Sequence, residues 1–304
     1  GGMGDDTITG GEGSDTVVFA GNKGDFTFEV AADGTLTVTD LNTMTALGVD
    51  TITGVETLSF DDGDLTVTTA EDGYVTLTGT DADDDVTVVG ATAVTLQGRA
   101  GHDDIVAGSG DDSIYGGDGF DEIIAGSGDD VVDGGMGDDT ITGGMGDDTI
   151  EGGYGQDTVI FDGVQDDFTF AVASDGTLTV TDTTSALGTD VISGVETLRF
   201  NDGDLTVTTT PMGDVTLTGT DGVDDVVTIV GAGGVTVEGV GGDDTLTGGM
   251  GSDTIAGAAG DDVVDGGMGD DTITGGEGSD TVVFAGNKGD FTFEVAADGT
   301  LTVT

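Results

Sequence analysis

A single carboxylate recurs at a fixed place in a nine-residue pattern, Gly-Gly-x-Gly-x-Asp-x-apolar-x, which the chain contains in fourteen copies. Residues 1–9 and 134–142 show the pattern with the same letters, Gly-Gly-Met-Gly-Asp-Asp-Thr-Ile-Thr. We number its places 1 to 9. Glycines at positions 1, 2 and 4 allow backbone angles closed to other residues and let carbonyl oxygens point inward. The aspartate at position 6 adds a negative oxygen at the end of the turn, which predicts a site for a hard cation.

Calcium suits this set of oxygen ligands best. It accepts roughly six to eight oxygen ligands in flexible geometry, whereas magnesium prefers a stricter octahedron that retains waters. Zinc and copper prefer Cys and His ligands, and the chain has no Cys and one His. The sequence therefore predicts calcium bound by repeated, mostly dehydrated turns.

Each turn must be held by the strand at positions 7–9, which is too short to fold alone. Position 8 alone is expected to point inward, so that stacked copies share one thin core. The copies are contiguous through 98–160 (seven), 239–283 (five) and 1–18 (two). The two longer runs differ by two copies, which indicates a full coil of two turns and two strands. Position 8 is filled by Ile8, Ile105, Ile114, Ile123, Val132, Ile141, Ile150, Leu246, Ile255 and Ile273, among others.

Two related segments, 19–78 and 161–218, lie between the runs and have a strand-like pattern. In the first, 26–30 and 36–39 alternate with period two across Asp33-Gly34, which is a strong hairpin signal. Thr and Val favour strands, and no helical period is sustained. We therefore expect an all-β chain in which small β modules continue or cap the stacks of nonapeptides, which we call rolls.

Each module leads into a degenerate copy and an interlude, at 79–97 and 219–238, where Asp84 and Asp224 are weaker ligand candidates. A longer repeat is superimposed on these elements, because residues 1–39 recur unchanged as 266–304. Residues 284–304 are therefore read as the start of a further module. The chain has the organisation of a window from a periodic polymer, in which one long period carries Gly1 onto Gly266.

These contiguous, in-frame nonapeptides resemble the RTX (repeats-in-toxin) family of secreted calcium-binding proteins. The resemblance covers 1–18, 98–160 and 239–283, and the Gly-Val-Glu-Thr-Leu-x-Phe-x-Asp-Gly segments at 54–63 and 194–203 are similar to β segments interleaved in that family. It implies a right-handed parallel β-roll with calcium held between turns that are two copies apart. The implied side-chain ligands are Asp6, Asp15, Asp103, Asp112, Asp121, Asp130, Asp139, Asp148, Asp157, Asp244, Asp253, Asp262, Asp271 and Asp280.

If each ion bridges alternate copies, the run of seven holds about five internal sites and the run of five about three, roughly eight in all. Some copies depart from the motif. The second Gly is replaced by Arg99, Val240 and Ala258, the first by Ala107 and Ala125, and position 5 holds His102, Phe120 and Gln156. Position 5 is expected to offer mainly backbone, so its substitutions are tolerable, whereas Arg99 places the first site of its run in doubt.

The composition excludes several classes of partner. Sixty-two acidic residues face four basic ones, for a net charge of −58. Nucleic acid and anionic membrane surfaces are repelled at that charge, and no apolar run approaches the roughly 18–20 residues of a membrane helix. Without Cys there is no disulfide framework. Since self-repulsion opposes a compact state, we expect a chain that folds on neutralisation by divalent cations.

Three functions remain open at this stage. The first is a structural segment of an extracellular fibre, surface layer or giant adhesin, which contacts copies of itself and is rigidified by calcium after export through a type I secretion system. The second is the calcium-binding tail of a secreted protease or lipase. The chain contains no His-Glu-x-x-His motif or nucleophile elbow, so no catalytic residue is expected within it. The third is a passive spacer that carries a ligand-binding domain.

Overall fold

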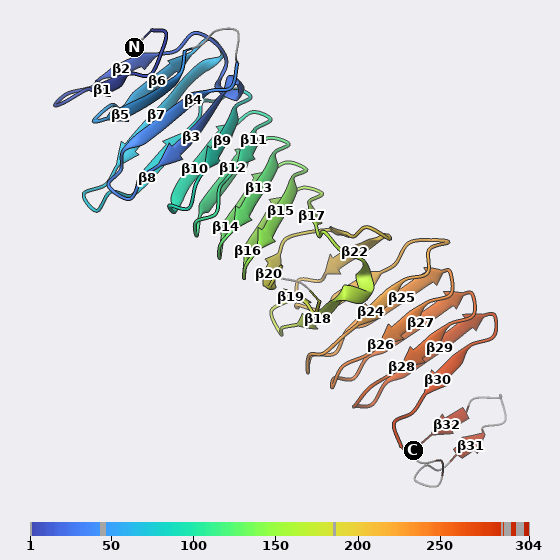
Figure 1. Cartoon of the computed structure of the whole chain (residues 1–304). Helices are drawn as coiled ribbons and strands as arrows, with labels where there is room; N and C mark the ends of the chain where they lie inside the picture. The colour runs from blue at the N-terminus through green and yellow to red at the C-terminus, as the bar shows by residue number, and fades with distance from the viewer. Residues whose placement is uncertain are drawn as a thin grey trace.

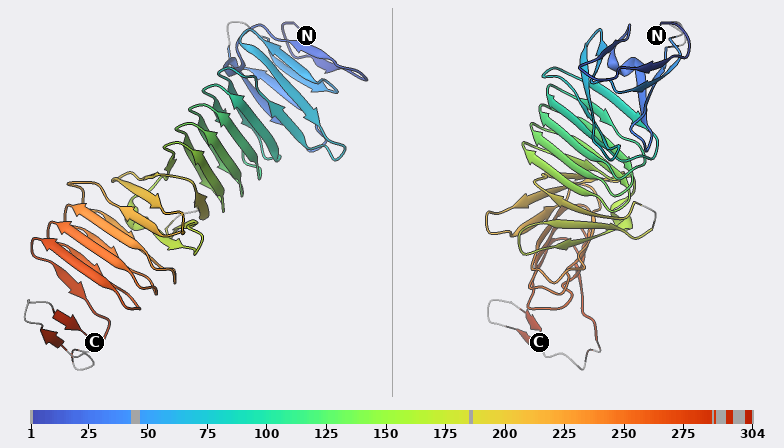
Figure 2. Two further views of the ribbon diagram at one scale, coloured as in Figure 1. Left: turned by 180° about the vertical axis from the view of Figure 1, so that it is seen from behind. Right: turned by 90° about the vertical axis from the view of Figure 1, so that its left-hand side faces the viewer.

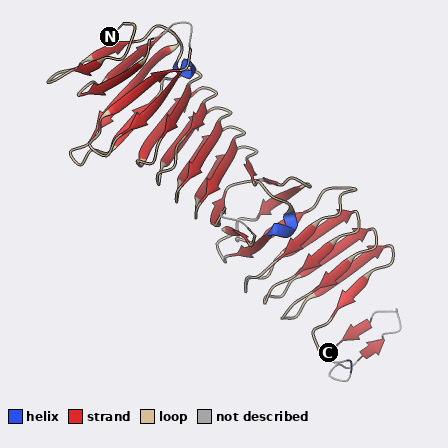
Figure 3. Ribbon diagram, viewed as in Figure 1, coloured by secondary structure: helices blue, strands red, loops and turns tan. Residues whose placement is uncertain are grey.

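The chain forms an elongated solenoid of short strands, with its two ends far apart (Figure 1). This computed structural model describes residues 2–42, 47–184, 187–286, 288, 293–295 and 301–303. Strands account for nearly all of the regular structure in the described residues, and the helical segments η1 and η2 are single 3-10 turns (Figure 3). No described helix has the length and apolar character needed to cross a membrane. The fold is an all-β parallel roll, as the sequence predicted.

The central run forms two parallel sheets that face each other (Figure 2). Successive strands of one sheet come from alternate copies, as the register pairs Ile114↔Val132 and Ile123↔Ile141 show. This confirms the coil of two turns and two strands. One sheet holds β10 (Val94–Ala100), β12 (Ser113–Asp118), β14 (Val131–Met136) and β16 (Thr149–Tyr154), and the other β9 (Asp85–Val89), β11 (Asp104–Val106), β13 (Glu122–Ser127), β15 (Thr140–Met145) and β17 (Thr158–Ile160).

Several strands extend beyond positions 7–9, where the sequence placed them. β13, for example, continues through positions 1–3 of the next copy. The period-two alternation then buries three places per copy, as Asp121, Ile123 and Ala125 show. Among positions 7–9 only position 8 points inward, as expected, and the longer strand carries positions 6 and 1 inward as well.

The second run repeats this design at the other end of the molecule. Its register again joins alternate copies, as in Leu246↔Val264 and Ile255↔Ile273. The strands are β25 (Thr236–Gly241), β27 (Thr254–Ala259) and β29 (Thr272–Glu277) in one sheet, and β24 (Val226–Thr228), β26 (Thr245–Thr247), β28 (Val263–Asp265) and β30 (Thr281–Val283) in the other. The first two copies of the chain supply β1 (Thr7–Thr9) and β2 (Thr16–Val18).

Each module adds a three-stranded antiparallel unit to both sheets. The expected hairpin across Asp33-Gly34 is confirmed, with Phe28 opposite Val38. The first module contains η1 (Lys23–Asp25), β3 (Phe26–Val30), β4 (Leu36–Asp40), β5 (Val49–Thr53), β6 (Thr57–Phe60), β7 (Gly63–Thr69) and β8 (Val75–Thr78). The second contains η2 (Gln165–Asp167), β18 (Phe168–Val172), β19 (Leu178–Asp182), β20 (Thr189–Ser193), β21 (Thr197–Arg199), β22 (Asp204–Thr209) and β23 (Val215–Thr218).

The start of a further module is visible as a hairpin near the C-terminus. Strands β31 (Phe293–Val295) and β32 (Leu301–Val303) pair Phe293 with Val303. This is the pairing of Phe28 with Val38, displaced by one long period. Much of the expected module at 284–304 lies outside the described residues.

The modules differ from the rolls in their core. Inward positions of the rolls are aliphatic, whereas the first module packs Phe19 against Phe60 with ring centroids 5.2 Å apart. The second module repeats this stack with Phe161 and Phe200, 5.3 Å apart. Aromatic rings bury more area than Ile or Val, so these phenylalanines add buried apolar area to the cores of the modules.

Candidate metal centre

The position-6 aspartates form ladders along both edges of the central roll. The backbone N–H of Asp121 donates to Oδ1 of Asp139 at 2.9 Å, and that of Asp139 donates to Oδ1 of Asp157 at 2.9 Å. On the opposite edge, Asp112 donates to Asp130 in the same way, at 2.7 Å. Each bond joins aspartates of alternate copies, so one carboxylate oxygen of each aspartate fixes the neighbouring coil.

The second oxygen of these carboxylates is left without a partner. Among the described residues, ten position-6 aspartates have an Oδ2 atom that is buried and accepts no hydrogen bond. A buried carboxylate oxygen without a partner is costly, and a bound cation removes that cost. The ten are Asp15, Asp103, Asp112, Asp121, Asp130, Asp139, Asp148, Asp157, Asp244 and Asp262.

The other four predicted ligands are arranged differently. Oδ2 of Asp253 accepts the backbone N–H of Gly249 at 3.0 Å, although the side chain is buried. Asp6, Asp271 and Asp280 are only partly buried, in the terminal coils of the two ends. The sequence treated all fourteen alike, whereas their surroundings depend on the coils stacked on either side.

Position 1 is glycine beside eight of the ten orphaned oxygens, and it is Ala107 beside Asp112 and Ala125 beside Asp130. A Cβ added to Gly116 would overlap Oδ2 of Asp121 and crowd the carbonyl oxygen of Gly134 in the next coil. The space beside Gly134 has the same surroundings, Oδ2 of Asp139 and the carbonyl oxygen of Gly152. A carboxylate oxygen and a carbonyl oxygen from successive coils thus converge on one cradle, and both are hard ligands of the kind calcium prefers.

Side chains alone do not assemble a metal site here. Within the described part of the chain, no group of three or more His, Cys, Asp or Glu side chains converges on one point. This agrees with a turn that contributes one carboxylate and otherwise backbone carbonyl oxygens. The residues present therefore fit calcium, with Asp121, Asp139 and their equivalents as the side chains that would hold it.

Comparison with known proteins agrees with this geometry. The profile of the RTX calcium-binding nonapeptide repeat matches more than half of the chain, over 1–21, 78–114, 95–123, 106–141, 115–150, 133–167, 230–264 and 247–282. The chain belongs to the RTX family. No curated protein matches the sequence.

One solved structure with similarity is the extracellular lipase LipA from Serratia marcescens, at 21% identity and a TM-score of 0.20. The match covers 60% of this chain and 37% of the lipase. The chain therefore spans well under two thirds of that protein. A similarity at this level of superposition supports no argument about fold or activity, so the RTX assignment depends on the repeats.

Burial sets the electrostatics of the RTX turns. It raises the pKa of Asp103, Asp121 and Asp157 to about 6, against partial opposition from the backbone N–H donors described above. Nearby carboxylates raise each pKa further. The same cause raises the pKa of Asp112 and Asp148 to about 6 on the opposite edge. A divalent cation in the cradle counters both effects, because it replaces lost hydration and neutralises the repulsion.

Position 5 has a role that the sequence did not predict. The side chain of Asp111 accepts the backbone N–H of Asp129 at 3.0 Å, and Asp129 accepts that of Asp147 at 2.9 Å. This second ladder runs in the opposite sense to the position-6 ladder. His102 takes part because Nδ1 accepts the N–H of Phe120 at 2.9 Å, and the two rings stack. Position 5 is thus a hydrogen-bond acceptor in Asp111, Asp129 and His102, although Phe120 at the same position has no side-chain acceptor.

Three turns keep the RTX geometry without the second glycine. Arg99, Val240 and Ala258 have φ values of 95°, 79° and 79°, in the left-handed region that favours glycine. The cradle of the first of these turns survives, since Oδ2 of Asp103 is among the orphaned oxygens. Arg99 therefore strains its turn, but the carboxylate of Asp103 at this first site keeps its place.

The first coil of each roll receives a partner from the preceding module. Nζ of Lys23 is fully buried, 2.9 Å from Oδ1 of Asp84 and 3.2 Å from Oδ1 of Asp62. At the second roll, Nε2 of Gln165 donates to Oδ1 of Asp225 at 2.9 Å. The weaker candidate Asp224 was therefore misplaced by one residue. An extra residue in the degenerate copy moves Asp225, with Val227 opposite Leu246, into the ladder.

Proposed function

We propose that this chain is a calcium-binding structural segment of an extracellular fibre, surface layer or giant adhesin, and that it folds and stiffens on calcium after export. The observation that carries the proposal is the set of buried, orphaned Oδ2 oxygens in rows along the solenoid. A protein without a cation in these cradles keeps uncompensated negative charge in its interior. Calcium is the cation whose ligand preference fits carboxylate and carbonyl oxygens together.

The net charge of −58 makes calcium part of the folding equilibrium. Where calcium is scarce, repulsion between carboxylates opposes stacking of the coils. Where calcium is abundant, its binding free energy adds to the free energy of folding, because the unfolded chain has no formed site. The chain would then be exported in an unfolded state and would become rigid outside the cell.

The long repeat supports a polymer. Residues 1–18 and 266–283 have the same sequence and occupy different places in the structure. The first copy pairs with strands of a module that follows it, as in Ile8↔Ile52. The second pairs with a coil that precedes it, as in Ile255↔Ile273. A coil of this sequence can therefore pair with a preceding coil on one side and with a following module on the other. Successive long periods can thus continue as one solenoid.

Exposed apolar side chains at position 3 support lateral contacts between copies. Met136 and Tyr154 are neighbours in the register of β14 and β16, and they are 56% and 80% exposed. Met250 and Met268 are exposed at the same position of alternate copies on the second roll. Exposed apolar side chains in rows favour protein contacts, so we propose that rods associate side by side through these edges.

Electron microscopy and circular dichroism of the purified chain test the proposal together. With millimolar calcium we expect rods that associate into filaments or sheets, and with excess chelator we expect loss of both the assemblies and the β-sheet signal. Magnesium at the same concentration is the control and should not restore them. A chain that keeps its β-sheet signal in chelator would overturn the calcium-dependent folding, and isolated rods in calcium would overturn self-assembly.

A further inference from the structure

The position-6 ladder continues beyond the nonapeptides into each module. Strand β21 pairs with β17 in the register of a coil, with Val159 opposite Leu198. Strand β20 pairs with β16 in the same way, with Ile150 opposite Ile192. We refer to residues 187–199 of the second module, and to the equivalent residues 47–59 of the first, as the closing segments. A closing segment has the strand register of a nonapeptide pair but a different sequence, and both closing segments lie outside the stretches that match the RTX repeat.

A glutamate of the closing segment takes the place of the next aspartate in the ladder. The backbone N–H of Asp157 donates to Oε2 of Glu196 at 2.9 Å. This is the bond that Asp139 makes to Oδ1 of Asp157 one coil earlier, also at 2.9 Å. Only Val195 separates Glu196 from Gly194, whereas positions 2 to 5 separate the first glycine of a nonapeptide from its aspartate. The longer side chain compensates for the shorter turn, which is why the motif does not reveal it.

The cradle of the last coil is complete only with the closing segment. The side chain of Asp157 is 0% exposed, and its Oδ2 is one of the orphaned oxygens. A Cβ added to Gly152 would lie 2.8 Å from this Oδ2 and would overlap the carbonyl oxygen of Gly194. In the preceding coil the corresponding carbonyl comes from Gly152 itself. Gly194 therefore supplies the oxygen that a further nonapeptide would supply.

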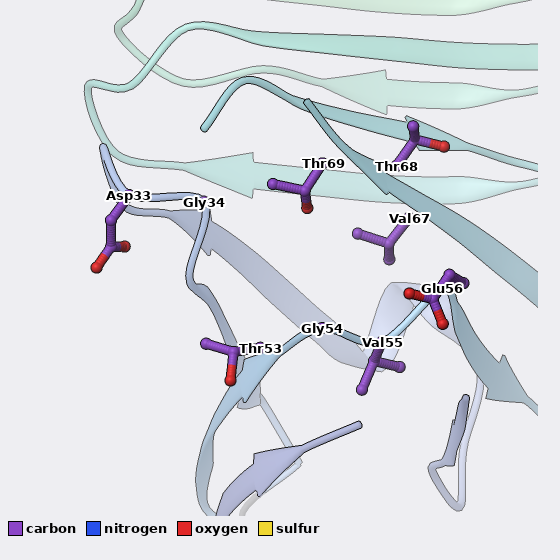
Figure 4. A pocket seen from close by; sticks show the side chains of 9 residues that line it. All are labelled: Asp33, Gly34, Thr53, Gly54, Val55, Glu56, Val67, Thr68 and Thr69. Carbon is purple, nitrogen blue, oxygen red and sulfur yellow. The ribbon is translucent and has the colours of Figure 1, made fainter. Parts of the chain in front are cut away.

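The first module shows the same arrangement a second time. The backbone N–H of Asp15 donates to Oε2 of Glu56 at 2.9 Å. The cradle at Gly10 lies between Oδ2 of Asp15 and the carbonyl oxygen of Gly54. Figure 4 shows Gly54, Val55 and Glu56 on one short turn that lines a pocket of about 380 Å³. The residues that line the pocket do not include Gly10 or Asp15, so the pocket is separate from the cradle.

We propose that the closing segment of each module completes a calcium site at the end of the preceding roll. One site lies between Asp157 and Gly194, and the other between Asp15 and Gly54. Glu196 and Glu56 hold the backbone of these aspartates and add a second negative charge beside each ion. The identity of the ion rests on the proposed function, and the inference adds sites that pairs of nonapeptides do not form.

A purely structural role for the glutamates makes a different prediction. If Glu196 and Glu56 serve only as hydrogen-bond acceptors, glutamine replaces them without consequence, because its carbonyl oxygen also accepts an N–H. If they also neutralise a cation, the loss of charge weakens calcium binding even though the hydrogen bond persists. The comparison of carboxylate with amide therefore separates the two roles.

Calcium titration calorimetry and equilibrium dialysis of the full chain test the sites. The double variant E56Q/E196Q should lose two tightly bound calcium ions per chain, or bind them at least about tenfold more weakly, with the β-sheet signal unchanged at saturating calcium. The control is the double variant E151Q/E238Q, which removes the same two charges from exposed places on β16 and β25. Equal calcium binding by the two double variants would overturn the inference and leave the proposed function intact.

A crystal structure of the unaltered chain grown in calcium provides the second test and needs no variant. Anomalous scattering should place an ion within about 2.3–2.6 Å of Oδ2 of Asp157 and of the carbonyl oxygen of Gly194. Ions in the cradles of the central roll with none at Gly194 would overturn the inference alone. A chain that binds no calcium in any assay would overturn the proposed function as well.

Discussion

The two modules start their rolls with different chemistry at one equivalent place. In the first, the ammonium group of Lys23 lies buried between Asp62 and Asp84. In the second, the amide of Gln165 donates to Asp225, and its Oε1 accepts the backbone N–H of Val226 at 2.8 Å. The backbone N–H groups of Lys23 and Gln165 are alike, since each donates to an aspartate of its own module at 3.0 Å.

This difference shows what the first coil of a roll requires. Within a roll, Oδ1 of each position-6 aspartate accepts an N–H from the preceding coil, and the first coil has no such neighbour. Either a cationic or a neutral donor takes that place, so a hydrogen-bond donor is the requirement and positive charge is an addition. Each module thus presents a donor to the roll that follows it and a carboxylate acceptor to the roll that precedes it.

Loss of the buried cation should have the largest effect. The variant K23M keeps the length and apolar contacts of the side chain but leaves Asp62 and Asp84 without the ammonium group. Breaking a buried ion pair on one side costs about 3–5 kcal/mol. The free energy of unfolding in calcium, from urea titrations, measures the effect.

The comparison with Gln165 supplies the control for this variant. K23Q places the amide of the second module in the first, and it should lose much less stability than K23M because a donor to Asp84 remains. Equal losses in K23M and K23Q would show that the charge, and not the donor, is required, and the equivalence of the two modules would then be wrong.

The buried aspartates of both rolls should make the stability of the chain depend on pH. Burial raises the pKa of five aspartates of the first roll to about 6, and it raises the pKa of Asp244 in the second roll to the same value; the five are Asp103, Asp112, Asp121, Asp148 and Asp157. A folded-state pKa above the ordinary value of 3.8 means that the charged form opposes folding. Without calcium, stability should therefore increase as the pH falls through about 6 towards about 4.

Calcium reverses the sign of this dependence. Protons and calcium compete for the same carboxylate oxygens, so acidification over that pH range should weaken the calcium-loaded protein. Circular dichroism at both ends of the range, in chelator and in calcium, measures both signs. Hydrogen exchange assigns the changes to residues 98–160 or 239–283. A chelated chain that gains no β-sheet signal on acidification would contradict the role given to the buried carboxylates.

The sequence predicted the parts of this structure that repeat locally. The regular spacing of Asp121, Ile123 and their equivalents predicts the two-copy coil. The hairpin at Asp33-Gly34 could be predicted because its two strands are close in sequence. The sequence did not predict the contacts of Lys23 with Asp84 and of Glu196 with Asp157, which join distant residues in stretches of different local pattern. Those contacts depend on how a module stacks against a roll, and no nine-residue period records that.

The misplacement of Asp224 has a related cause. A one-residue insertion in the degenerate copy leaves the motif readable in either frame, and only the pairing of Val227 with Leu246 decides between them. The side-chain role of position 5 was missed because Asp and His are different residue types. What they have in common is an atom that accepts a hydrogen bond, and the sequence pattern does not show this. The spacing of the aspartates in the sequence thus predicted where the ladders lie. The residues at which each ladder begins and ends depend on pairing between distant strands.

The smallest expected effect concerns the first nonapeptide of each roll, where position 2 is Arg99 in one and Val240 in the other. Both are left-handed, and a side chain there costs about 1–2 kcal/mol relative to glycine. V240G should therefore stabilise the calcium-loaded protein by about 1 kcal/mol. R99G should gain less, because it also loses an exposed ion pair of 3.4 Å with Asp81. Urea titrations of the two variants rank the gains. A larger gain for R99G would mean that the guanidinium disturbs its turn beyond the backbone strain, and that the two rolls begin with turns of unequal quality.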